Sequence, residues 1–105
     1  MPVPEVTVAE LSDKRAEGAP LIDVREPAEW EEFRAPGAVL IPLGQVADRL
    51  DEVPAEGTVY VICKVGGRSA KAAEIMRAAG IDAVNVAGGS LAWRDAGFPV
   101  ESGPA

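Results

Sequence analysis

Short apolar runs and amphipathic segments alternate along most of the chain. Four runs predict buried strands, because each is short, rich in aliphatic or β-branched residues and bounded by turn residues. They cover residues 20–25, 38–42, 58–63 and 83–89, the last of which runs into a glycine turn. The remaining segments predict helices over residues 8–18, 27–33, 43–53, 68–80 and 90–97. Strands that alternate with helices favour an α/β domain with a mainly parallel sheet and helices on both faces.

Capping signals support several of these helices. Thr7 and Glu10 form a plausible capping box at the start of the first helix. Gly80 suits the C′ position after the fourth helix. The segment 43–53 has one apolar helical face, made of Leu43, Val46, Ala47 and Leu50.

The length and composition predict one globular domain. It would cover residues 1–105, with about residues 100–105 as a loose C-terminal tail. Hydrophobic residues make up 48% and charged residues 26%, which is typical of a folded chain. The formal net charge of −7 disfavours binding to nucleic acid or to anionic membranes. No apolar stretch approaches the roughly 20 residues that span a bilayer, so we expect no membrane-spanning segment, and we also expect no secretory signal.

The cysteine and histidine counts narrow the chemistry. A single cysteine cannot form an internal disulfide, so we expect a reducing, cytoplasmic setting. The chain has no histidine, which excludes Cys–His and Ser–His catalysis and leaves only carboxylates and one thiol for a zinc site. We therefore predict no metal and no organic cofactor. Any chemistry at Cys63 must activate the sulfur without an imidazole base.

Cys63 lies at the junction between the most convincing strand and the helix that follows, in the stretch YVICKVGGRSAKAAE. Open α/β sheets bind ligands at the carboxyl edge of their strands, where this cysteine ends its strand. Gly66 and Gly67 allow the backbone to curl. The unpaired N–H groups at the helix N-terminus carry partial positive charge. The sequence therefore predicts an anion cradle of main-chain amides with a sulfur at its base.

Positive charge is concentrated around this thiol, although the protein is acidic. Lys64, Arg68 and Lys71 lie between Glu56 and Glu74 with no acidic residue among them. Cations and a helix N-terminus lower a cysteine pKa below its ordinary value of about 8.5, so we expect a thiolate at neutral pH. The pattern C-x4-R-S adds a forked guanidinium donor at the mouth of the cradle.

Each of these residues also has a plain structural interpretation. Cys63 could be a small apolar residue that ends a buried strand. The glycines could form an ordinary turn, and Arg68 could be a solvated side chain. The order of strand, cysteine, glycine loop, arginine and helix favours the functional interpretation.

Four stretches resemble the rhodanese family of sulfurtransferases, in family order and over nearly the whole chain. They are LIDVREPAEW at residues 21–30, APGAVLIPL at 35–43, YVICKVGGRSAKAA at 60–73 and VNVAGGSLAW at 84–93. The resemblance implies a five-stranded parallel sheet flanked by helices. The chain departs from the family pattern at Arg34 and Ala35, in a region that often has a histidine just before the PGA turn.

The resemblance also implies a reaction. Cys63 would take a sulfane sulfur from a small anionic donor such as thiosulfate, hold it as a persulfide and release it to a thiophilic acceptor such as cyanide. Asp23 and Arg25, at the carboxyl end of another strand, are expected to support the site, with Asp23 bracing the active loop. The residues expected to bind the donor are those of the loop itself: Lys64, Val65, Gly66, Gly67, Arg68 and Ser69.

Other functions stay open. The same Cys63 chemistry would serve a persulfide carrier that passes sulfur between partner proteins in cofactor or tRNA thiolation. Phosphatases and arsenate reductases share this architecture but use a C-x5-R loop, one residue longer than the loop from Cys63 to Arg68, which also lacks an evident general acid. A binding module that has lost activity is disfavoured, because the cysteine, the arginine and both glycines are present.

Overall fold

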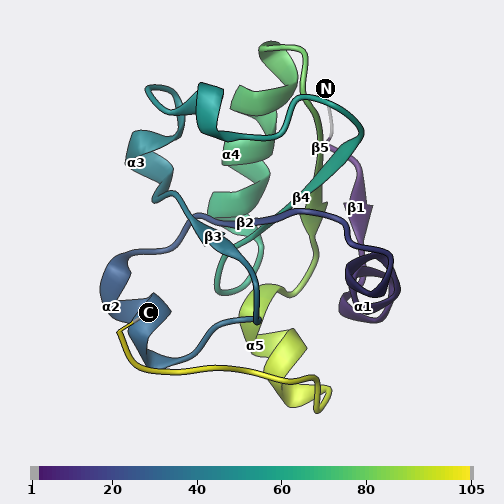
Figure 1. The fold of residues 1–105 in the computed structure, drawn as a ribbon, viewed down its shortest axis with the longest axis vertical. Helices are drawn as coiled ribbons and strands as arrows, with labels where there is room; N and C mark the ends of the chain where they lie inside the picture. The colour runs from purple at the N-terminus through teal and green to yellow at the C-terminus, as the bar shows by residue number, and fades with distance from the viewer. Residues whose placement is uncertain (1–2, 105) are drawn as a thin grey trace.

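The computed structural model describes residues 3–104, which form an α/β fold around a five-stranded parallel sheet (Figure 1). The strand order is β1-β5-β4-β2-β3, and every neighbouring pair is parallel. The central strand is β4, in which Val59, Val61 and Ile62 are fully buried. The predicted fold class is confirmed. The strands are β1 (Glu5–Val6), β2 (Leu21–Asp23), β3 (Val39–Leu40), β4 (Thr58–Ile62) and β5 (Asp82–Val86).

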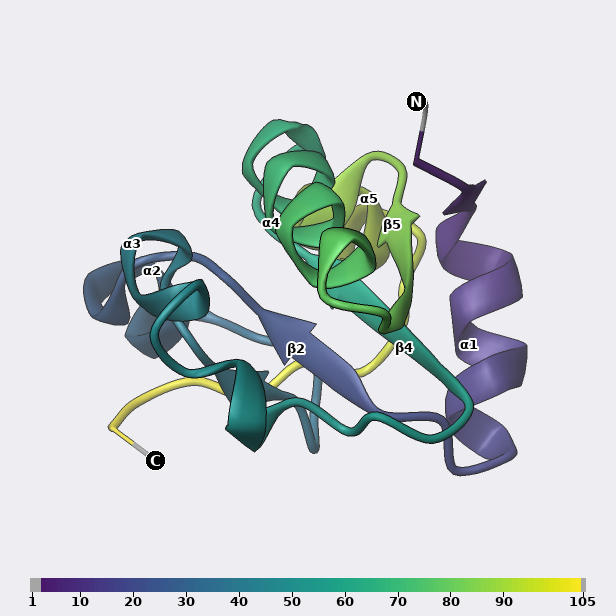
Figure 2. The same ribbon diagram turned by 90° about the horizontal axis from the view of Figure 1, so that it is seen from above.

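Helices cover both faces of the sheet and enclose two apolar cores (Figure 2). Leu11 of α1 and Trp93 of α5 belong to one core, and Val46 of α3 and Met76 of α4 belong to the other. None of the residues of α2 is buried. We find no candidate membrane-spanning helix among residues 3–104. The helices are α1 (Val8–Ala16), α2 (Pro27–Glu32), α3 (Leu43–Val46), the 3-10 turn η1 (Leu50–Glu52), α4 (Gly67–Ala78) and α5 (Gly89–Asp95).

The capping signals read from the sequence are confirmed. The Glu10 N–H donates to Thr7 Oγ1 at 3.1 Å, and the Thr7 N–H donates to Glu10 Oε1 at 2.9 Å. Gly80 has a φ of +88° just after the C-cap of α4. Both features depend on residues a few positions apart, which is why a local pattern identifies them.

The single helix predicted over residues 43–53 is wrong. α3 ends at Val46, and the chain leaves helical geometry at Arg49, where φ is −123° and ψ is 26°. Gly44 and Asp48 are weak helix formers, which lowers the helical tendency of this segment. Two short turns therefore carry the apolar side chains that a continuous helix was expected to present.

β1 is the strand that the apolar pattern does not predict. It pairs Glu5 with Asn85 and Val6 with Val86 at the edge of the sheet. Two residues are too few to show the alternation or apolar run that identifies a strand. Only the family resemblance implied a fifth strand.

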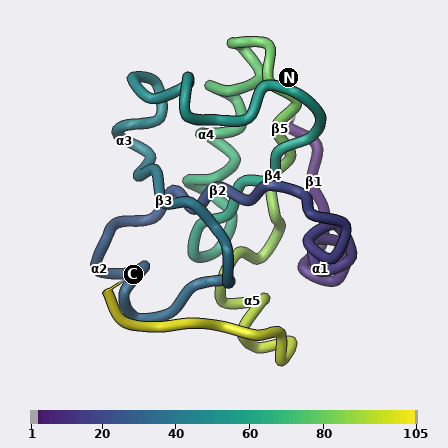
Figure 3. The backbone as a smooth tube through the Cα atoms, viewed as in Figure 1, coloured from purple at the N-terminus to yellow at the C-terminus, as the bar shows by residue number. Residues whose placement is uncertain are grey.

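The C-terminal segment crosses from α5 to α2 (Figure 3). Arg34 and Glu101 exchange backbone hydrogen bonds of 2.8 and 2.9 Å. The Arg34 side chain also donates to the Gly103 carbonyl at 2.6 Å, so the residue in the family's histidine region ties this segment to the chain after α2. The looseness expected of residues 100–105 concerns motion and stays a prediction, and residue 105 lies outside the described residues.

Candidate active site

The loop after β4 lies at the carboxyl edge of the sheet. Asp23, at the end of β2, pairs with Ile62 of β4, so Cys63 follows immediately beyond this level of the sheet. Gly66 is the N-cap of α4 and has a φ of +112°, a conformation that L side chains rarely adopt. Gly67 begins α4 without a positive φ and has open space where a Cβ would lie. Of the two glycines expected to allow the curl, Gly66 therefore has the backbone conformation that favours glycine, and Gly67 does not.

The loop directs hydrogen-bond donors at the sulfur. Cys63 Sγ accepts from the Gly66 N–H at 3.1 Å and from the Ser69 hydroxyl at 3.2 Å. Cys63 is only 1% exposed, and this burial raises the pKa of its thiol. Hydrogen bonds outweigh that effect and leave the pKa below its ordinary value: those of the Ser69 side chain and of the Ser69, Gly66 and Val65 backbone. The structure thus stabilises a thiolate without an imidazole.

Asn85 of β5 is a site residue that the sequence reasoning missed. Its Oδ1 accepts from the Ser69 hydroxyl at 2.5 Å, and its Nδ2 donates to the Gly66 carbonyl at 3.1 Å and to Glu5 Oε2 at 2.7 Å. A hydroxyl has one proton, so Ser69 can donate either to Asn85 or to Cys63, but not fully to both. The available signal was an asparagine inside an apolar strand, because buried polar groups need partners.

The N-terminus of α5 forms backbone hydrogen bonds with the loop. The Ser90 N–H donates to the Cys63 carbonyl at 2.8 Å, and the Leu91 N–H donates to the Lys64 carbonyl at 3.1 Å. Gly89 has a φ of +61°, and a Cβ there would lie 2.5 Å from the carbonyl oxygens of Cys63 and Lys64. A glycine at this position therefore allows the two backbones to approach closely.

Arg68 forms a forked contact with an anion, but the anion is a carboxylate of the protein. Its Nη1 donates to Glu29 Oε1 at 2.7 Å and its Nη2 donates to Glu29 Oε2 at 2.9 Å. The hydrogen bonds from Arg68 are the main reason that the pKa of Glu29 falls to about 2. The same contact raises the pKa of Arg68. No local pattern could identify Glu29, because it comes from α2, 39 residues away in the sequence.

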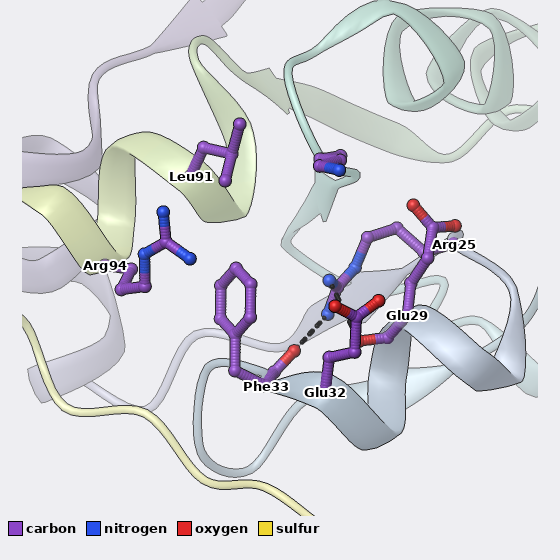
Figure 4. Close-up of a pocket in the computed structure, with 7 residues that line it drawn as sticks. Arg25, Glu29, Glu32, Phe33, Leu91 and Arg94 are labelled. Carbon is purple, nitrogen blue, oxygen red and sulfur yellow. Dashed lines mark hydrogen bonds between the residues drawn. The ribbon is translucent and has the colours of Figure 1, made fainter.

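The other predicted loop residues face outward. Lys64 and Val65 are exposed, Val65 by 63%. A cavity of about 80 Å³ lies beside the loop (Figure 4). In it, the Phe33 ring has the guanidinium of Arg94 at 4.8 Å from its centroid. The lining residues come from the segments around α2, the loop and α5: Arg25, Glu29, Glu32, Phe33, Lys64, Leu91 and Arg94.

Asp23 and Arg25 form a buried ion pair next to the site. Arg25 Nη2 lies 2.8 Å from Asp23 Oδ2, and both side chains are 1% exposed. Arg25 also donates to the carbonyls of Glu29 at 3.3 Å and Phe33 at 2.7 Å, so the pair holds the C-terminal end of α2. Within residues 3–104, the hydrogen bonds of the Asp23 carboxylate go to Arg25 and not to the loop. The structure therefore connects Asp23 to the loop through Arg25, α2 and the ion pair with Arg68.

Comparisons with known proteins agree with this geometry. Residues 7–96 match the rhodanese-like domain family. The chain is 33% identical over 101 residues to a sulfurtransferase of Allochromatium vinosum, covering 93% of this chain and 94% of that protein. It is 37% identical over 94 residues to the putative sulfur carrier protein YrkF of Bacillus subtilis, covering 87% of this chain.

The chain also matches solved structures over nearly its whole length. A rhodanese-like domain protein from Staphylococcus aureus superposes with a TM-score of 0.84 at 38% identity, covering 95% of this chain and 100% of the other. Some curated relatives are longer: the chain spans 51% of YrkF and 24% and 46% of two further matches. Sulfurtransferases and sulfur carriers are thus both among the relatives. On these grounds the chain belongs to the rhodanese-like domain family.

Proposed function

We propose that this protein is a sulfurtransferase that moves sulfane sulfur through a persulfide on Cys63. One observation carries the proposal: Cys63 Sγ accepts hydrogen bonds from the Gly66 N–H and the Ser69 hydroxyl, which stabilise an anionic sulfur. Thiosulfate with cyanide is the small-molecule form of this reaction. We also propose that the protein acts in the cytoplasm, with a small anionic donor and a thiophilic acceptor as its partners.

The reaction has two displacement steps. The Cys63 thiolate attacks the outer sulfur of thiosulfate, the S–S bond of the donor breaks, and its electron pair leaves with sulfite. The persulfide anion that remains on Cys63 occupies the cradle of loop amides. Cyanide then attacks the outer sulfur, which forms thiocyanate and returns the electron pair to the cysteine thiolate.

The other loop residues would bind and orient the donor. Lys64 and Val65 are exposed beside the sulfur, so they lie where an incoming donor first meets the loop. Arg68 could bind the donor's oxyanion only after its guanidinium breaks the ion pair with Glu29. In this proposal Asp23 and Arg25 act at a distance, as positioning residues that hold α2.

Intact mass after treatment with thiosulfate tests the persulfide. We expect the reduced protein to gain the mass of one sulfur atom, and the gain should disappear after dithiothreitol or cyanide. Cys63→Ser should gain nothing. An unchanged wild-type mass after treatment with thiosulfate and, separately, with a hydropersulfide would falsify the assignment, and hydrolysis of an aryl phosphate instead would favour the phosphatase alternative.

A second candidate function is a persulfide carrier between proteins. The ion pair between Arg68 and Glu29 favours it, because the guanidinium is already occupied by a carboxylate. The relative named as a putative sulfur carrier supports the same alternative. Steady-state thiosulfate:cyanide kinetics separate the two: saturable and efficient turnover supports the enzyme, whereas very slow turnover with rapid transfer from a protein persulfide supports the carrier.

A further inference from the structure

The Cys63 site already contains an anionic group, which is the carboxylate of Glu29. This carboxylate accepts both N–H groups of the Arg68 fork, at 2.7 and 2.9 Å, and the backbone N–H of Glu26 at 3.0 Å. The Glu29 side chain is 23% exposed and that of Arg68 36%, so water screens the pair only in part. Three charge-assisted hydrogen bonds hold the carboxylate in this position.

The ion pair between Arg68 and Glu29 changes the net charge that an incoming donor encounters beside the Cys63 thiol. The sequence places Lys64, Arg68 and Lys71 near the thiol, but the structure neutralises Arg68 and leaves two exposed lysines. A dianion such as thiosulfate must then either displace Glu29 or approach the thiolate without the guanidinium. Both routes place additional negative charge beside a carboxylate and a thiolate, which raises the free energy of the complex.

We propose that Glu29 is a specificity-determining residue that slows sulfur loading from small oxyanion donors and favours hydropersulfides, in which the transferable sulfur is attached to an uncharged group. This inference rests on the proposed persulfide function of Cys63. A hydropersulfide R–S–SH needs no contact to an oxyanion. The ion pair between Arg68 and Glu29 therefore does not raise the free energy of its complex with the protein. A cysteine persulfide on a partner protein is the donor class with this chemistry.

The transfer of sulfur from a hydropersulfide to Cys63 needs no further reactant. The Cys63 thiolate attacks the outer sulfur of R–S–SH and forms a new S–S bond. The S–S bond of the donor breaks, its electron pair leaves with R–S⁻, and the proton stays on the transferred sulfur. Loss of that proton to water then gives the persulfide anion that the loop amides stabilise.

Single-turnover loading of Cys63 tests the inference with two donors. Thiosulfate and the hydropersulfide of 2-mercaptoethanol are each mixed with reduced protein, and the gain of one sulfur atom is followed by intact mass. Glu29→Gln keeps the shape of the side chain and an acceptor for the Glu26 N–H, but it removes the negative charge and the second oxygen that hold the Arg68 guanidinium. Removal of one negative charge beside a dianion should raise the thiosulfate rate about tenfold, and the gain should shrink as salt is added.

The controls identify the cause. Glu31→Gln makes the same change of net charge on an exposed residue of α2 and should leave both rates unchanged. Glu29→Gln should change the hydropersulfide rate far less than the thiosulfate rate, and an unchanged far-UV circular dichroism spectrum shows that the variant is folded. The double variant with Arg68→Ala should lose the thiosulfate gain, because the freed fork is what binds the oxyanion.

The outcomes distinguish the two proposals. The selectivity role is overturned if Glu29→Gln loads from thiosulfate no faster than wild type, if it accelerates both donors equally, or if the double variant keeps the gain. In each of these cases Cys63 still becomes a persulfide, so the proposed function stands. If neither donor loads sulfur on Cys63 in any variant, the proposed function itself fails.

Discussion

The Ser69 hydroxyl should control how much of Cys63 is thiolate at a given pH. Ser69→Ala removes the donor that lies 3.2 Å from Sγ, while the Gly66 N–H stays in place. Because this hydroxyl favours the charged sulfur, its loss raises the pKa of Cys63. The thiolate population therefore falls at every pH below the new pKa.

The size of the effect follows from the geometry. A hydrogen bond to a charged group contributes about 1.5–3 kcal/mol. The low end applies here, because Ser69 has one proton and Asn85 Oδ1, at 2.5 Å from the hydroxyl oxygen, competes with the sulfur for it. About 1.5 kcal/mol reduces the thiolate population roughly twelvefold. A less acidic thiol is a better nucleophile, which returns about a factor of three, so alkylation should slow about fourfold.

Alkylation by iodoacetamide between pH 5 and 9, followed by intact mass, measures this directly. The pH at half-maximal rate should move upward in Ser69→Ala, and the fourfold loss should appear on the acid side of the curve. Ser90→Ala is the matched control: Ser90 is also buried beside the loop, but its Oγ has no hydrogen-bond partner within residues 3–104. An unmoved midpoint in Ser69→Ala, or an equal change in Ser90→Ala, would refute the reasoning.

Three further predictions follow from the same structure. Gly66→Ala should lower the unfolding free energy by about 1–2 kcal/mol because of its positive φ, whereas Gly67→Ala, at the start of α4, should leave it unchanged or slightly higher; urea unfolding compares the two. Asp23→Asn leaves the Arg25 charge buried without its partner and should cost about 3–5 kcal/mol, seen as a large drop in Tm. Glu29 has a pKa of about 2 against an ordinary 4.5, so its stabilising effect is complete above pH 4.5 and is lost as the pH falls toward 2; the stability difference between wild type and Glu29→Gln should shrink over that window.

Each of these has a result that would contradict it. Equal unfolding midpoints for Gly66→Ala and Gly67→Ala would mean that the loop does not hold its left-handed residue in solution. An Asp23→Asn protein as stable as wild type would show that Arg25 finds another partner or reaches water. A constant stability difference between pH 6 and pH 3 would show that Glu29 is not ion-paired in the folded state.

The sequence by itself determined the features that depend on neighbouring residues. The Thr7–Glu10 capping box, the C′ glycine at position 80 and the place of Cys63 after β4 all follow from residues a few positions apart. Alternating apolar runs and amphipathic segments were sufficient for the α/β class, because burial requires that pattern in any such fold. The segment 43–53 shows the limit of this reasoning, since an apolar face alone does not guarantee a continuous helix.

Only the tertiary structure decided what surrounds the sulfur. In the sheet, β4 lies between β2 and β5. That arrangement joins Arg68 to Glu29 across 39 residues and Ser69 to Asn85 across 16. Lys64, Arg68 and Lys71 are the only charged residues between Glu56 and Glu74, so the sequence predicts that Arg68 binds the donor. The folded chain supplies a carboxylate from a distant helix, because a half-buried charge is stabilised by an opposite charge wherever the topology brings one within reach.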